Sequence, residues 1–199
     1  MAQTLEQLTR TNDTLTSIRG IVHTMKTLSA INAAPYEQAA QSIGLYHETI
    51  LQGLAAFVHR TGGVSFLSEA VKPNTRLLVA FGSDHGLCGN YNELVADAVT
   101  AYSVEQPMAK QHILCIGSRL GNALLEQELT PDVVLMPPAS ADGVGRLAGD
   151  IVTRIEQLGS GQALTELAVT MVFTQRAEHG YQETVSRELL PLAQSLLRP

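Results

Sequence analysis

The sequence predicts an α/β protein: a three-layer sandwich with a mainly parallel sheet, preceded by a long coiled-coil-type helix. Two observations predict this fold class. Residues 5–58 repeat apolar side chains every seven positions, which is typical of a helix that packs on another helix. Residues 77–197 alternate short apolar runs with helical stretches, which is typical of parallel strands joined by right-handed crossovers. The chain should therefore divide into a helical segment at 1–60, a linker at 61–76 and an α/β domain at 77–199.

The N-terminal segment predicts one helix of about 50 residues, or roughly 75 Å at 1.5 Å per residue. Its first row of seam positions is Leu8, Leu15, Val22, Ser29, Tyr36, Ile43, Ile50 and Phe57. The companion row is Ile18, Met25, Asn32, Ala39 and Tyr46. Pro35 lacks the backbone donor that a helix needs and predicts a kink. A long kinked helix is the favoured interpretation, and two amphipathic helices at 5–34 and 36–59, packed on the α/β domain, are the alternative.

The second part predicts four strands and four helices in alternation. Apolar runs indicate strands at 77–81, 112–116, 133–136 and 167–173. Helices are expected at 92–104, 118–129, 143–158 and 186–197. Ser118 is expected to cap the second of these helices, and Pro191 interrupts the last one.

Composition excludes several classes of protein. The formal net charge of −6 argues against a general nucleic-acid binder. No run approaches the ~20 apolar residues of a membrane span. The polar N-terminus lacks the layout of a secretory leader, and two cysteines fit a reducing cytosol.

The segment with the most candidate chemistry is the loop at 82–90, between the first expected strand and the next helix. Its glycines do not have the spacing of a dinucleotide or phosphate-binding motif, and it contains no lysine. Asp84, His85 and Cys88 could form a nucleophile with its base, but such sets are normally assembled from distant parts of a chain. We expect Cys88 to pack in the core, as free cysteines usually do, and Asp84 and Asn92 to cap backbone N–H groups. The sequence thus predicts no catalytic residue, cofactor or metal ligand.

Three motifs carry a resemblance to a known family. The first is IRGIVHTMKTLSA at 18–30, and the second is Ser-Asp-His-Gly-Leu-Cys-Gly at 83–89 followed by Asn92. The third combines Ile-Gly-Ser-Arg at 116–119 with Leu-Leu-Pro-Leu at 189–192. The chain resembles the gamma subunit of rotary ATP synthases, and its beginning is most similar to the divergent, often sodium-linked branch. Gamma chains continue into a C-terminal helix, so we expect a chain that ends at Pro199 to be truncated or to lack that helix.

The resemblance implies a non-catalytic central-stalk subunit that couples ion translocation to ATP synthesis or hydrolysis by rotating inside the catalytic ring. The implied partners are the alpha, beta and epsilon subunits and the membrane rotor ring, at the cytoplasmic face of the inner membrane. Met25 and Lys26 would contact the catalytic ring. Structural roles fall to the motif residues Ser83, Asp84, Gly86, Leu87, Cys88, Gly89 and Asn92.

Two other functions remain open from the residues alone. One is a small α/β phosphate- or nucleotide-binding protein with a helical docking arm, and the other is a coiled-coil adaptor that uses residues 5–58. We also expect the isolated chain to self-associate through the N-terminal helix, because one helix cannot bury its own apolar stripe.

Overall fold

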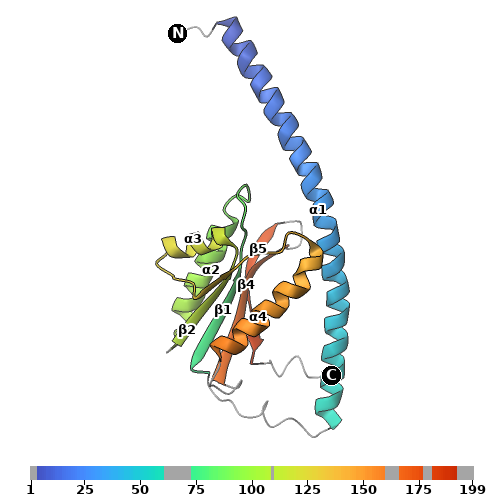
Figure 1. Ribbon diagram of the computed structural model, residues 1–199, viewed down its shortest axis with the longest axis vertical. Helices are drawn as coiled ribbons and strands as arrows, with labels where there is room; N and C mark the ends of the chain where they lie inside the picture. The colour runs from blue at the N-terminus through green and yellow to red at the C-terminus, as the bar shows by residue number, and fades with distance from the viewer. Residues whose placement is uncertain (1–3, 61–72, 109, 160–165, 177–180, 192–199) are drawn as a thin grey trace. The chain divides into compact units, whose positions relative to one another are not determined.

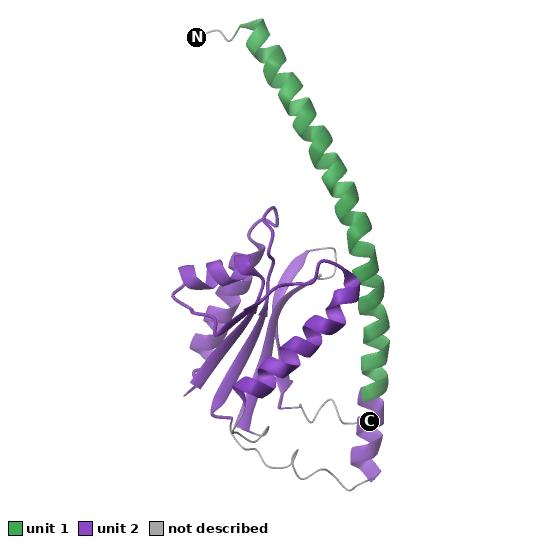
Figure 2. Cartoon of the chain, in the orientation of Figure 1, with its two compact units in different colours: residues 1–50 green, residues 51–199 purple. Residues whose placement is uncertain are grey.

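The computed structural model describes residues 4–60, 73–108, 110–159, 166–176 and 181–191. The chain forms two compact units, residues 1–50 and 51–199, which are coloured separately in Figure 2. The boundary between them lies within the first helix. Most of the expected linker at 61–76 is outside the described residues, so the domain division read from the sequence stays a prediction.

Helix α1 spans Leu5–Arg60 as one continuous helix of 56 residues. It continues without a break through Pro35, so the alternative of two separate helices is wrong. Hydroxyl groups along it bond the carbonyl four residues earlier, as Thr24 Oγ1 does to Gly20 O at 3.0 Å. These bonds satisfy polar side chains within the helix itself. None of its described residues is buried.

The α/β unit is built on a five-stranded sheet in the order β3-β2-β1-β4-β5 (Figure 1). The strands are β1 (Thr75–Phe81), β2 (Lys110–Ile116), β3 (Val133–Leu135), β4 (Leu167–Arg176) and β5 (Gln182–Leu190). The first four run parallel, and β5 pairs antiparallel with β4. The four predicted strands and the mainly parallel sheet are confirmed.

Helices cover both faces of this sheet, which makes the predicted three layers (Figure 1). On one face lie α2 (Tyr91–Glu105) and α3 (Ser118–Glu126). On the other lies α4 (Val144–Leu158), which follows a short 3-10 helix, η2 (Ala141–Gly143). Leu78 packs in the first core with α2 and α3, whereas Leu77 packs in the second core with α4. Strand β1 is apolar at successive positions because both of its faces are covered.

The last predicted helix is wrong. Residues 182–190 form strand β5, in register with β4 through pairs such as Thr174 with Thr184. Arg187 also lies over the ring of Phe173 on β4, 5.6 Å from its centroid. Pairing with the open edge of β4 gives this segment backbone hydrogen bonds that outweigh its local helical pattern. Residues 192–197 of the predicted helix lie outside the described residues.

Candidate functional site

The order in which the chain adds strands to the sheet reverses beside β1. From β1 the chain builds outward to β2 and β3, and then crosses to place β4 on the other side of β1. In open α/β sheets, ligands favour the carboxyl ends of the strands at such a reversal. The loop at 82–90 leaves the carboxyl end of β1 at this point, so it is the first place to look for a site.

Asn92 organises the inside of this loop. Its Oδ1 accepts the Ser83 N–H at 2.9 Å, and its Nδ2 donates to Ser83 Oγ at 3.0 Å. Ser83 Oγ in turn donates to the His85 carbonyl at 3.0 Å. The Asn92 side chain is buried, so these bonds satisfy an amide that would otherwise be costly to bury. Asn92 thus binds a backbone N–H group, as the sequence predicts.

Cys88 packs against the same network. Its Sγ lies 3.4 Å from both Ser83 Oγ and Asn92 Nδ2, and its thiol points to the His85 carbonyl at 3.6 Å. His85 contributes its backbone to that contact and not its imidazole. Cys88 is only half-buried and its Sγ lies among polar groups of the turn, so the prediction that it packs in the core is wrong. These contacts also do not form the nucleophile and base considered from the sequence.

Asp84 ties the loop to the next helix. Its Oδ1 accepts the Ser118 N–H at 2.7 Å, and the Ser83 carbonyl accepts the Arg119 N–H at 3.0 Å. The cap of α3 therefore comes from Asp84, and the predicted Ser118 side-chain cap is wrong, since Gly117 occupies the cap position without a side-chain bond. A carboxylate is favourable there because a helix N-terminus carries partial positive charge.

Two glycines allow this close approach. A Cβ on Gly82 would lie 2.3 Å from the Leu120 Cβ. Gly117 has φ +105, and a Cβ there would lie 2.7 Å from the Ser83 carbonyl oxygen. The Ile-Gly-Ser-Arg and Ser-Asp-His-Gly motifs are thus two halves of one junction between β1, β2 and α3.

The outer part of the loop is exposed. Gly89 has φ +61, and Leu87 has φ 65 although it is not a glycine. The Leu87 side chain is 92% exposed. A Cβ on Gly86 would lie 3.5 Å from Arg119 Nη2. Nothing in the sequence around Leu87 predicts its left-handed backbone.

The second cysteine lies beneath this junction. Cys115 on β2 is buried, and burial raises the pKa of its thiol to about 12, with the nearby Asp84 charge acting in the same direction. Burial likewise raises the pKa of Tyr91, although a hydrogen bond with Thr174 opposes it. Both groups are therefore held in their neutral forms near neutral pH.

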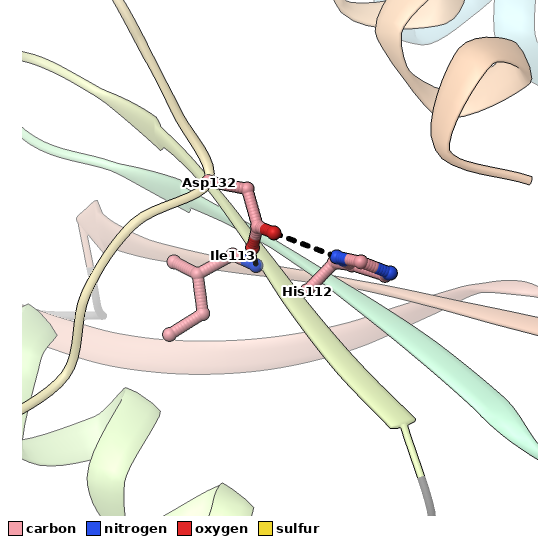
Figure 3. A network of polar contacts seen from close by, with 3 residues as sticks. All are labelled: His112, Ile113 and Asp132. Atoms are coloured by element: carbon pink, nitrogen blue, oxygen red, sulfur yellow. Dashed lines mark hydrogen bonds and ion pairs between the residues drawn. The ribbon is translucent and has the colours of Figure 1, made fainter.

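A separate polar network joins β2 to the start of β3, and Figure 3 shows its three residues. Asp132 Oδ2 accepts the Ile113 N–H at 2.8 Å, and its Oδ1 lies 2.8 Å from His112 Nδ1. Burial alone would raise the pKa of Asp132, but the bonds from Ile113 and His112 hold it below its usual value. The Nε2 of His112 is buried and has no hydrogen-bond partner among the described residues. This network was not predicted, because Asp132 has no feature in the sequence that sets it apart from an ordinary residue before a strand.

A buried arginine at the start of β1 was not predicted either. Arg76 is 3% exposed, bonds the Gln106 carbonyl and side chain, and lies 4.9 Å from the ring centroid of Tyr102. Tyr102 Oη is 3.2 Å from Thr170 Oγ1. These contacts hold the C-terminal end of α2 against the sheet and shield the Arg76 guanidinium from solvent.

The predicted ring-contact residues belong to the other unit. Met25 and Lys26 are both exposed on α1. Within the described ranges, no group of three or more His, Cys, Asp and Glu side chains is arranged to hold a metal ion. A search of the same part of the chain finds no helix with the length and apolar character of a membrane span.

Comparison with known proteins gives a consistent result. A family model described as ATP synthase matches residues 4–197. The ATP synthase gamma chain of Dinoroseobacter shibae is 26% identical over 206 residues, a match that covers 97% of this chain and 66% of that relative. This chain thus spans slightly less than two thirds of the length of that relative. A chain in the central stalk/c-ring structure of Tetrahymena thermophila mitochondrial ATP synthase has the same fold. Its TM-score is 0.65 at 19% identity, over 86% of this chain and 72% of that one.

Proposed function

Because this chain belongs to the ATP synthase gamma-chain family, we propose that it acts as a central-stalk rotor subunit. In this role it couples ion translocation to ATP synthesis or hydrolysis by rotating within a ring of catalytic subunits. Its partners are the ATPase alpha, beta and epsilon subunits and the membrane rotor ring. It is a peripheral part of a membrane complex, at the cytoplasmic face of the cell inner membrane.

The observation that carries this proposal is α1. A helix of 56 residues is roughly 84 Å long at 1.5 Å per residue, far longer than the mean globular helix of about 11–12 residues. It keeps an apolar stripe although none of its described residues is buried. A long, continuous helix with a surface for partners suits an axle, which must transmit torque without bending freely.

The proposed role is mechanical and not catalytic. The polar side chains of Ser83 and Asp84 in the loop at 82–90, and of Asn92 in the first turn of α2, bond the backbone or one another. These bonds support a structural role for the motif. We therefore expect the isolated chain neither to bind nor to hydrolyse ATP, and micromolar nucleotide affinity in calorimetry, lost on mutation of this loop, would contradict the proposal.

Within the complex, Met25 and Lys26 contact the catalytic ring. Both are exposed on α1, where an apolar and a basic side chain stand next to each other. The α/β unit, with the exposed Leu87 of its loop, lies at the foot of the stalk towards the membrane rotor ring.

Reconstitution tests the proposal directly. The 199-residue chain is combined with catalytic alpha and beta subunits of the same organism, and a bead is attached to its α/β unit. We expect a stable complex in which ATP hydrolysis depends on the chain and the bead turns in one direction. Failure to form the complex, or ATP hydrolysis with a stationary bead, would contradict the rotor role.

A substitution at Lys26 tests the proposed contact with the catalytic ring separately. Lys26→Gln should lower the torque measured from bead rotation, whereas Arg10→Gln removes the same charge elsewhere on α1 and should not. Equal torque in both variants would place the contact at other residues while leaving the rotor role intact.

A further inference from the structure

Strand β5 forms one edge of the five-stranded sheet (Figure 1). None of its residues is buried, and only Thr184, Val185 and Leu190 are half-buried. By contrast, six of the seven residues of β1 are buried. A segment with few buried contacts opens locally at a lower free-energy cost than the core does. Strand β5 should therefore leave the sheet more readily than β1.

We propose that β5 is a strap that opens from the edge of β4, and that Arg76, Tyr102 and Glu188 form the latch that holds the strap closed. In this latch, the guanidinium on β1, the phenol ring near the end of α2 and the carboxylate on β5 act as one chain of contacts. The proposal concerns the chain by itself and goes beyond the rotor role.

Tyr102 contacts one residue from each of three neighbouring strands. The Cζ of Arg76 on β1 lies 4.9 Å from its ring centroid. Its Oη is 3.2 Å from Thr170 Oγ1 on β4 and donates to Glu188 Oε1 on β5 at 3.4 Å. Thr170 and Glu188 are partners in the register of β4 with β5. Because a phenol has one proton and a carboxylate only accepts, Thr170 must donate to Tyr102.

The charge of Arg76 needs compensation at this position. Arg76 is 3% exposed, and no carboxylate in the described parts of the chain lies within ion-pair distance of it. Its Nε is buried and lacks a hydrogen-bond partner there. A buried cation is costly unless negative charge faces it. The Gln106 carbonyl supplies part of that charge, since a helix C-terminus is partly negative, and the face of the Tyr102 ring supplies more.

Glu188 adds to this compensation through Tyr102. A phenol that donates its proton to a carboxylate gains negative charge on its oxygen and ring, because hydrogen-bonded groups polarise one another. A more negative ring attracts the guanidinium more strongly. When β5 opens, the hydrogen bond from Tyr102 is lost and the attraction on the buried cation also weakens. Arg76 therefore favours the closed strap by way of Tyr102.

Amide hydrogen exchange of the full chain tests the strap and the latch. We expect the amides of β5 that pair with β4 to exchange roughly tenfold or more faster than those of β1. Tyr102→Phe keeps the ring over Arg76 and removes only the hydroxyl. It should lower the protection of β5 by roughly threefold to tenfold and leave that of β1 unchanged.

Tyr181→Phe is the matched control, because it removes the hydroxyl of a tyrosine that is 76% exposed and should leave both strands unchanged. A β5 that is protected as strongly as β1 would overturn the strap. Equal effects of the two Tyr→Phe substitutions would overturn the latch.

Charge removal tests the part that Arg76 plays. Glu188→Gln should lower the protection of β5 by roughly twofold to fivefold in the parent chain, and by a clearly smaller factor in Arg76→Met. Arg76→Lys keeps a cation and should preserve most of the penalty. Glu183→Gln removes the same charge from the same strand, opposite Gln175, and should act equally in all three backgrounds.

A Glu188→Gln penalty that is the same in the parent and in Arg76→Met would overturn the role of Arg76 in the latch. Loss of that penalty in Arg76→Lys would also overturn it, because the charge would then not be what Glu188 senses. The comparison of Tyr102→Phe with Tyr181→Phe decides on the latch even where Arg76→Met fails to fold.

Discussion

Helix α1 and the α/β unit differ in where their side chains find contacts. The α/β unit buries an apolar core on each face of its sheet and bonds its loop side chains internally. The described part of α1 buries no residue, and most of its Ser and Thr hydroxyl groups bond carbonyl groups of the same helix. The α/β unit thus has the contacts it needs for stability, whereas α1 presents a surface whose stability depends on what binds it. Equivalent substitutions in the two regions should therefore have different effects.

The largest difference is expected for core truncation. Leu78 on β1 is fully buried, so Leu78→Ala should destabilise the α/β unit by about 2–5 kcal/mol through lost transfer energy and a residual cavity. Ile18→Ala on α1 removes a side chain that is 50% exposed and should leave that unit unchanged. Amide hydrogen exchange of β1 in each variant makes the comparison. Equal loss of protection would mean that α1 stabilises the α/β unit.

Glycine replacement should change stability in opposite directions. Gly117→Ala forces a side chain into a left-handed backbone and against the Ser83 carbonyl, and should cost about 1–3 kcal/mol. Gly20→Ala on α1 meets nothing within 4 Å and should stabilise the helix by up to about 1 kcal/mol. Circular dichroism during thermal unfolding measures both. A stabilised Gly117→Ala would contradict the close approach of the two loops.

The same contrast explains how much of the fold could be predicted. Strand β1 was predictable because burial on both faces demands an uninterrupted apolar run, and α1 because its heptads persist. Strand β5 was not, because only its pairing with β4 distinguishes Ser186–Leu190 from a helix, and that edge is distant in sequence. The sequence left open whether the helix continues through Pro35. A proline removes one backbone hydrogen bond, whereas the turns on either side of it keep theirs, and the sequence does not show which effect dominates.

The site was predictable only in part. That Asp84 and Asn92 bind backbone N–H groups follows from their residue types and positions, in the loop after a strand and at the start of the next helix. The partner of Asp84 could not be predicted in this way, because Ser118 lies in a turn distant in sequence that the parallel pairing of β1 and β2 brings close to Asp84. The Asp132 and Arg76 networks have no local signal, since each depends on a neighbour that is 19 or more positions away. Whether Met25 and Lys26 contact a ring stays a prediction.

A smaller effect is expected for the cap on α3. Asp84→Ala removes the acceptor of the Ser118 N–H and should lower stability by about 1 kcal/mol, whereas Asp84→Asn keeps an oxygen acceptor and should lose less. Urea unfolding measures the difference between the two variants. If Asp84→Ala unfolds like the parent yet abolishes coupling in an assembled ATPase, the carboxylate serves the complex and not the cap.

The smallest effect depends on pH. The hydrogen bonds from Ile113 and His112 lower the pKa of Asp132 in the folded chain, so the unfolded chain binds a proton more readily. The ionised carboxylate therefore contributes stability above its unfolded pKa of about 3.9, and this contribution disappears as pH falls through the lower folded value. Because Asp132 is partly exposed, we expect Asp132→Asn to cost only about 0.5–1 kcal/mol at pH 7.

The difference between parent and Asp132→Asn should thus shrink once the pH falls below about 4. Asp13→Asn on α1 is the matched control, because that aspartate is exposed and should change stability little at any pH. Urea titrations of the three chains from pH 7 to pH 3 provide the measurement. A penalty for Asp132→Asn that stays constant with pH would mean that shape, and not charge, holds β2 to β3. A pH-dependent penalty for Asp13→Asn would show that α1 also depends on a charged contact, and would remove the contrast between the two regions.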